Sequence, residues 1–170
     1  MYLDHYECCF ASAFQPFGHA VAQGSLNSEA LVHGKHPGRE LDNNVLTGVK
    51  AVGYWDAEQD QNWNVPSHRN EALGILFLER GSLGFSVDDC EYVLQPDDIT
   101  VTLPWQLHRI GLPHVTSSRA HFLILDLGAR NPEEEWKWPS WLVLSKADLD
   151  ELTGRLRENE YPVWRSPAAL

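Results

Sequence analysis

The middle of the chain repeats apolar residues at the spacing of β-strands. Residues 72–79 form a long, mostly apolar run, as expected of a strand buried on both faces. Shorter runs rich in β-branched and aromatic residues follow at 83–87, 91–94 and 99–103, and 120–127 is the last strong run. The pattern predicts a mainly β domain built from short antiparallel strands.

Turn residues separate these runs. Asp88-Asp89-Cys90 and Pro96-Asp97-Asp98 both contain aspartate, which tolerates the left-handed backbone of tight turns. Upstream, the segment VLTGVKAVGYWD at 45–56 predicts the first strand, and residues 57–67 read as a polar loop.

The two ends of the chain differ from the middle. Glycines and prolines interrupt residues 1–42, which we expect to form a leader or arm outside the core. His5, Cys8, Cys9 and His19 lie there, but adjacent cysteines do not fit the usual spacing of a zinc site.

Residues 131–170 predict a connector and a C-terminal helix. Ser145 is a candidate N-cap, and Asp148 completes a capping box. Leu149, Leu152 and Leu156 share one helical face, which we expect to pack on the barrel formed by residues 43–130.

Composition and charge narrow the class of protein. With 170 residues, 43% of them hydrophobic, the chain suits one domain with its own core. Its net charge of -11 argues against direct binding to nucleic acid. The three cysteines, two of them adjacent, cannot form a set of disulfides, and the sequence shows neither a secretory signal nor an apolar run long enough to span a membrane. These features predict a cytoplasmic protein with no membrane partner.

The segment HRNEALGILFLERGSLGFSVDDCEYVLQPDDITVTLPWQLHRIG, which begins at His68, resembles the effector-binding half of AraC-type transcription regulators. The GYWD and WPS segments, which begin at Gly53 and Trp138, also match that family, and the resemblance covers roughly residues 45–160. It implies a cupin-type antiparallel β-barrel (a double-stranded β-helix, or jelly roll) followed by a C-terminal α-helix. The family's dimerising helices and DNA-binding helix-turn-helix motifs are not in this chain, so we expect an excised sensor half, or else a stand-alone sensor.

A metal-binding cupin uses two histidines and a glutamate from its first motif and a histidine from its second. By the resemblance, His68 and His108 match the first and last of these ligands, whereas Asn70 and Gly74 replace the other two. Glu71 follows Asn70 directly and should point the other way. We therefore expect no metal, no cofactor and no catalysis.

The same positions suit a neutral polar ligand, because imidazole and amide groups both donate and accept hydrogen bonds. Residues two apart on a strand share a face, which groups His68 with Asn70, His108 with Ile110, and His121 with Leu123. The resemblance adds Thr47, places His121 at a position that lines the sugar pocket in this family, and implies a sugar or sugar derivative as ligand. Trp105 replaces the glycine that is usual in the family and could cap the pocket. The predicted ligand-binding residues are Thr47, His68, Asn70, Trp105, His108, Ile110, His121 and Leu123.

Each residue also has a purely structural interpretation. Thr47 can simply begin a strand, Trp105 can cover the barrel rim, and a single barrel histidine such as His121 is more often a core residue than a ligand contact.

The expected function is that of a ligand-sensing domain of a bacterial regulator, which meets DNA only through a further domain and can form a homodimer. The alternatives are a metal-dependent cupin enzyme, such as an isomerase or dioxygenase, and a structural or dimerising barrel without an effector.

Overall fold

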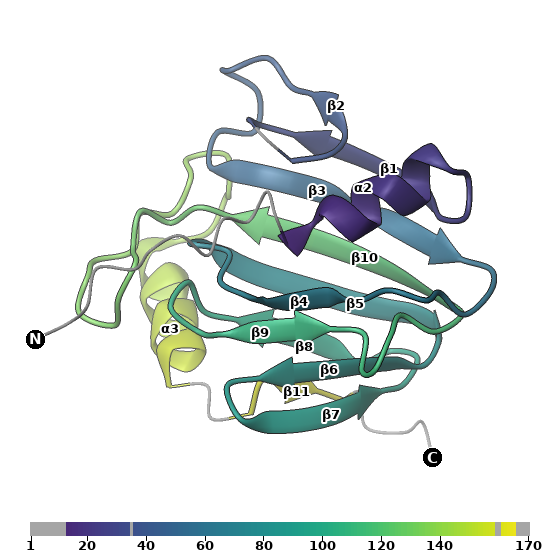
Figure 1. The fold of residues 1–170 in the computed structure, drawn as a ribbon. Helices are drawn as coiled ribbons and strands as arrows, with labels where there is room; N and C mark the ends of the chain where they lie inside the picture. Colours follow the sequence, from purple (N-terminus) through teal and green to yellow (C-terminus); the bar gives the residue numbers. More distant parts are fainter. Residues whose placement is uncertain (1–12, 35, 159–160, 166–170) are drawn as a thin grey trace, which may run out of the picture.

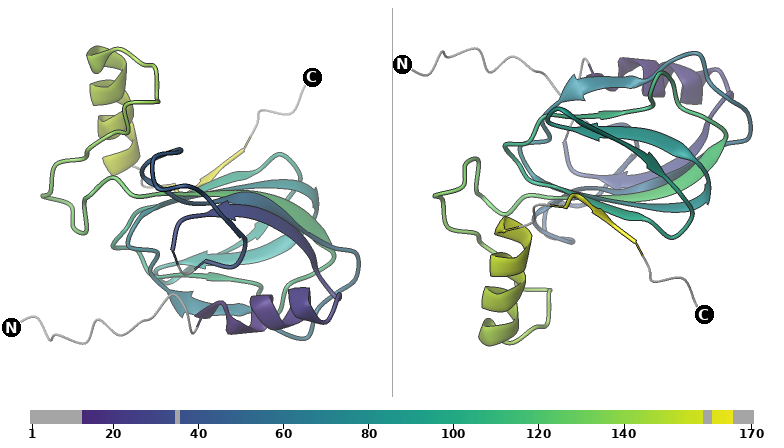
Figure 2. Two further views of the ribbon diagram at one scale, coloured as in Figure 1. Left: turned by 90° about the horizontal axis from the view of Figure 1, so that it is seen from above. Right: turned by 90° about the horizontal axis from the view of Figure 1, so that it is seen from below.

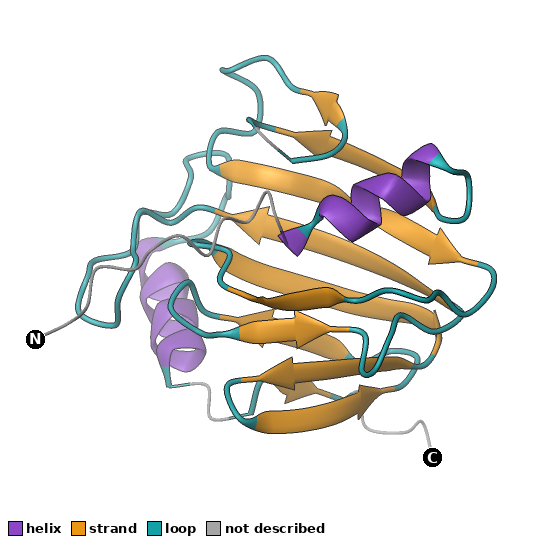
Figure 3. Cartoon of the chain, in the orientation of Figure 1, coloured by secondary structure: helices purple, strands orange, loops and turns teal. Residues whose placement is uncertain are grey.

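The computed structural model describes residues 13–34, 36–158 and 161–165 (Figure 1). It is mainly β, with two helices among these residues (Figure 3). The elements are α2 (Gln15–Ala22), β1 (Asn27–Val32), β2 (Arg39–Glu40), β3 (Val49–Ala57), β4 (Val65–His68), β5 (Leu73–Gly81), β6 (Leu83–Val87), β7 (Cys90–Leu94), β8 (Ile99–Thr102), β9 (His108–Ile110), β10 (Ser118–Leu125), α3 (Lys146–Arg157) and β11 (Val163–Trp164).

Strands β3 to β10 pair in a nested order. β3 pairs with β10, β4 with β9, β5 with β8 and β6 with β7, all antiparallel. The strand order is β11-β8-β5-β10-β3-β1-β2 in one sheet and β4-β9-β6-β7 in the other. Nested pairing of eight strands over two facing sheets defines a jelly roll. The predicted cupin-type β-barrel is therefore confirmed.

The core lies between the two sheets. Leu78, Leu83, Phe85 and Leu94 are all buried there, on strands whose bounds lie close to the predicted ones. The predicted turns also form, since Asp88 and Asp97 have φ of 50° and 71°. Aspartate thus occupies the left-handed backbone that each turn requires.

The N-terminal region contributes to the core, contrary to the expectation for residues 1–42. Phe17, Ala20, Leu26 and Val32 are buried, and β1 pairs with β3 along its full length. Figure 1 shows α2 crossing in front of the larger sheet, and Phe17 of α2 contacts Trp55 of β3. These short elements carry little periodicity of their own, because their stability comes from packing on the barrel rather than from helix or strand propensity.

Two further segments differ from the prediction. The supposed loop at 57–67 ends inside β4, and residues near the C-terminus add β11 to the edge of the larger sheet. His5, Cys8 and Cys9 lie outside the described residues.

The C-terminal helix forms as predicted. Ser145 Oγ accepts a hydrogen bond from Asp148 N, and Asp148 Oδ2 accepts one from Ser145 N. These two bonds form a capping box. Leu152 and Leu156 pack with Trp136 and Leu127 at one end of the barrel. Figure 2 shows α3 at this end, projecting beyond the two sheets. Neither described helix is long and apolar enough to cross a bilayer.

Candidate ligand-binding site

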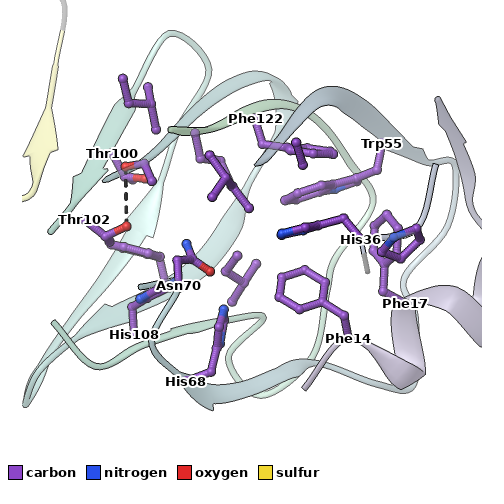
Figure 4. A pocket seen from close by; sticks show the side chains of 18 residues that line it. Phe14, Phe17, His36, Trp55, His68, Asn70, Thr100, Thr102, His108 and Phe122 are labelled. Atoms are coloured by element: carbon purple, nitrogen blue, oxygen red, sulfur yellow. Dashed lines mark hydrogen bonds between the residues drawn. The ribbon is translucent and has the colours of Figure 1, made fainter. Parts of the chain in front are cut away.

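A cavity of about 60 Å³ lies inside the barrel (Figure 4). One part of its wall is polar and comes from β4, β8 and β9 with the segment after β4: His68, Asn70, Thr100, Thr102 and His108. The remaining wall is mainly apolar and aromatic: Phe14, Phe17, Trp55, Phe85, Ile110 and Phe122. His36 and Pro37, from the connection between β1 and β2, complete it. Barrel strands and N-terminal segments therefore build the cavity together.

The aromatic residues pack ring against ring. Trp55 stacks on Phe122 with 6.0 Å between ring centroids, and Phe17 meets Trp55 edge-on at 6.2 Å. Phe14 contacts the His68 ring edge-on at 5.1 Å. Figure 4 shows the His36 ring entering the cavity between Trp55 and Phe14. These contacts join the N-terminal segments directly to the cavity wall.

His68 and His108 form a cross-strand pair between β4 and β9, with 4.3 Å between their ring centroids. His68 Nδ1 lies 2.8 Å from Pro66 O, and His108 Nδ1 lies 3.3 Å from Gln106 O. Because a carbonyl only accepts, both neutral rings carry their proton on Nδ1 and leave Nε2 as an acceptor.

Burial keeps these rings neutral. It lowers the pKa of His108 to about 3, with a smaller contribution from neighbouring His68. Burial also lowers the pKa of His68, against the opposing effect of its hydrogen bond to the Pro66 carbonyl. The pKa of His36 falls to about 4, first through burial and then through the charge of Lys50. None of the described lining residues is Lys, Arg, Asp or Glu, so the cavity is uncharged near neutral pH.

The residues present do not fit the metal site of a cupin. A Cβ built on Gly74 would lie 2.4 Å from Thr102 Oγ1 and 2.9 Å from Asn70 Nδ2, so these two side chains fill the space that a glutamate would need. Among the described residues, no group of three or more His, Cys, Asp or Glu side chains is placed to hold a metal ion. The His68–His108 pair lacks the anionic ligand of such a centre.

Four of the predicted ligand-binding residues line this cavity: His68, Asn70, His108 and Ile110. The family resemblance and the two-residue spacing predicted these four residues, which lie on β4, just after β4 and on β9. Their contact with a ligand stays a prediction.

His121 and Leu123 do not line the cavity, contrary to the prediction. They lie on the outer face of β10, where His121 Nε2 is 2.5 Å from Glu79 Oε2 and Leu123 packs beside the C-terminal cluster. Their neighbours Phe122 and Ile124 face inward instead. Successive residues of a strand point to opposite faces, so an error of one position moves the whole set outside.

Trp105 and Thr47 also lie away from the cavity. Trp105 packs in the cluster at the α3 end of the barrel, which matches its structural interpretation as a rim residue. Thr47 is exposed and precedes β3, and its carbonyl accepts a hydrogen bond from Trp141 Nε1. It lines a separate, polar surface depression beside Lys50 and Asp126.

The sequence reasoning missed most of the aromatic wall. The alternation in β10 held the signal for Phe122, because Ala120, Phe122 and Ile124 are apolar whereas Arg119 and His121 are polar. For Phe14, Phe17 and His36 no such signal exists, since nothing local ties the N-terminal segments to the barrel interior.

No protein-family model and no curated protein sequence matches the chain. Several solved structures resemble it at a distance. A conserved protein of unknown function from Streptococcus pyogenes is 12% identical with a TM-score of 0.45, covering 61% of this chain and 75% of its own. A cupin 2 conserved barrel domain protein from Salinispora arenicola is 12% identical with a TM-score of 0.43, covering 61% and 77%. A predicted oxalate decarboxylase from Thermotoga maritima is 15% identical with a TM-score of 0.43, covering 50% and 74%. Likeness at this level says nothing of substrate or ligand.

Proposed function

We propose that this chain is a metal-free cupin-type domain that binds a small organic molecule inside its barrel, and that it serves as the effector-sensing domain of an AraC-type regulator. The observation that carries the binding function is the uncharged cavity, which has an aromatic wall and a neutral His68–Asn70–His108 polar wall. The regulatory part rests on the sequence resemblance. Such a sensor would work in the cytoplasm and reach DNA through a domain outside this chain.

The N-terminal segments supply the means of signalling in this proposal. Phe14, Phe17 and His36 line the same cavity as the barrel strands, so a ligand would contact both parts at once. A ligand shifts an equilibrium only if it binds one state better than the other. Ligand binding would therefore favour the docked arrangement of α2 and the His36 segment over an undocked one.

The size of the cavity supports such a movement. At about 15 Å³ for each water, a free volume of about 60 Å³ holds on the order of four waters. A larger molecule needs room from a side chain that can move. His36 is suited to this, because it lies on a connection between strands and is only partly buried.

The wall also favours a ligand less polar than the sugar expected from the resemblance. Aromatic rings can cover the apolar face of a sugar, but its hydroxyl groups need hydrogen-bond partners on every edge. The described cavity gathers most of its polar groups on one side.

A thermal-shift series tests the proposal. Pentoses, hexoses and small neutral aromatic alcohols are each tested with chelator present, beside iron, manganese and zinc alone. A ligand at about a hundred times its dissociation constant should stabilise the domain by about 2.7 kcal/mol. A shift that survives chelator supports the proposal, and a shift seen only with metal favours the cupin enzyme instead.

Paired variants locate the site. Asn70→Ala should weaken binding of whichever compound gives the shift, because Asn70 lines the cavity. His121→Ala should leave it unchanged, because His121 lies on the outer face of β10. Loss of binding in His121→Ala with full binding in Asn70→Ala would place the site elsewhere.

A further inference from the structure

We infer that the ligand is a neutral, largely apolar aromatic molecule carrying a hydrogen-bond donor toward Asn70 and His108 and an acceptor toward Trp55. This inference rests on the proposed binding function and adds the chemical class of the ligand. It follows from unpaired buried polar atoms and from the absence of charge in the described wall.

Asn70 and His108 call for a donor. Asn70 Oδ1 is buried and has no hydrogen-bond partner among the described residues. His108 Nε2 is also an acceptor, because its Nδ1 proton points to Gln106 O. Thr102 Oγ1 donates to Gly74 O at 3.4 Å, so this hydroxyl too is left to accept. A ligand hydroxyl or N–H would satisfy this mainly accepting wall.

Trp55 calls for an acceptor. Its side chain is only 6% exposed, and its Nε1 is buried without a partner among the described residues. An indole N–H only donates, and a buried donor without an acceptor is costly. Figure 4 places Trp55 across the cavity from Asn70 and His108. The ligand's donor and acceptor would therefore lie at opposite ends of its body.

The wall between these ends suits a flat apolar ring. Trp55 and Phe122 stack with 28° between their planes, and Phe14 lies on another side of the space. Offset-stacked and edge-to-face contacts with such rings favour an aromatic partner.

Charge is the third constraint. A buried carboxylate or ammonium group needs a partner of opposite charge, and the described wall supplies none. Both barrel histidines resist protonation, as the lowered pKa of His108 reflects. A neutral ligand therefore fits where an acid or an amine does not.

Four matched probes test the inference by calorimetry at pH 6.5. 4-Hydroxyacetophenone carries a donor and an acceptor at opposite ends. 4-Methoxyacetophenone lacks the donor, 4-ethylphenol lacks the acceptor, and 4-hydroxybenzoate adds a negative charge. A lost hydrogen bond should weaken binding roughly two- to ten-fold for each of the first two changes, and the charge should cost about ten-fold or more. The same four probes are also measured with His36→Ala, which removes the His36 ring from the cavity wall. Differences between probes in this variant cannot arise from displacement of that ring.

Two variants test which residue contacts each end of the probe. Asn70→Ala should abolish the preference for the hydroxy over the methoxy compound, and Trp55→Phe the preference for the acetyl over the ethyl group. Asn64→Ala and Trp63→Phe are the matched controls, because neither residue lines the cavity, and both preferences should persist in them.

Equal binding of all four probes, or preferences that persist in Asn70→Ala and Trp55→Phe, would overturn the ligand class. If none of the four probes binds to the parent or to His36→Ala but a sugar stabilises the domain, the ligand class is wrong and the binding function stands. If neither sugars nor probes bind, both proposals fall.

Discussion

His68 and His108 face each other across two neighbouring strands inside the barrel, with 4.3 Å between their ring centroids. Each ring is oriented by a backbone carbonyl two residues before it, Pro66 O and Gln106 O. By the sequence resemblance, they match two of the ligands of a metal-binding cupin, and Asn70 and Gly74 occupy the positions of the other two. In the structure they form part of a cavity wall without Lys, Arg, Asp or Glu among the described lining residues.

Burial of neutral His108 should make stability depend on pH. Its pKa is about 3 in the folded chain and 6.5 in the unfolded chain, so the unfolded state binds more protons between these values. The free energy of unfolding should therefore fall as the pH falls from 6.5 toward 3, by about 1.4 kcal/mol for each pH unit from this residue. Urea titrations at pH 7, 6 and 5 measure the slope. His108→Gln should reduce it and exposed His19→Gln should not; equal slopes in all three proteins would refute the assignment.

Gly74 should tolerate no side chain. Since an added Cβ would lie 2.4 Å from Thr102 Oγ1, Gly74→Ala should lower the free energy of unfolding by about 1–3 kcal/mol. Gly154→Ala is the control, because a Cβ there meets nothing within 4 Å in helix α3. That substitution should stabilise the domain by about 0.5–1 kcal/mol. Denaturant unfolding compares them, and a Gly74→Ala protein as stable as the parent would show that the pocket has spare room.

Asp126 should be important for holding the segment after β10. Its carboxylate accepts hydrogen bonds from Arg130 Nη1 at 2.9 Å and Gly128 N at 2.9 Å, and Lys50 Nζ lies 3.1 Å away. Burial raises the pKa of Asp126, but these partners outweigh it and lower the pKa to about 2.

Asp126→Asn should therefore destabilise the chain by about 1–2 kcal/mol at pH 7. The difference should be present above about pH 4 and disappear as the pH falls toward 2, because the carboxylate becomes protonated. Unfolding at several pH values checks this, with exposed Asp42→Asn as the control. A difference that does not change with pH would mean that the charge of Asp126 is not the cause.

The capping box of α3 gives a direct test of a feature predicted from sequence. Ser145→Ala removes the acceptor for Asp148 N and should lower stability by about 1 kcal/mol, or roughly 2–4 °C in Tm. Ser145→Asn keeps a capping side chain and should stay close to the parent. Thermal unfolding followed by circular dichroism distinguishes them, and identical midpoints for the parent and Ser145→Ala would show that the cap adds no stability.

Much of the barrel was predictable because its information is local. The apolar run at 72–79 gave β5, and the aspartates at 88 and 97 marked turns that need a left-handed residue. Ser145 and Asp148 likewise fixed where α3 begins. Each prediction depended on residues within a few positions of one another.

The inward-facing set of β10 was predictable in principle. Arg119 and His121 are polar, and Ala120, Phe122 and Ile124 are apolar, so alternation alone indicates which set is buried. Matching the strand to a family position instead of to its own alternation placed His121 in the pocket.

The sequence by itself determined the main barrel strands, the turns at Asp88 and Asp97 and the C-terminal helix, because these depend on side-chain chemistry and short-range spacing. Only the tertiary structure decided that Phe14, Phe17 and His36 close the cavity and that Trp55 lies across from Asn70. These contacts join segments far apart in the chain. They exist only once the nested strand pairing has brought the two sheets face to face, and no local pattern records which distant side chains then meet.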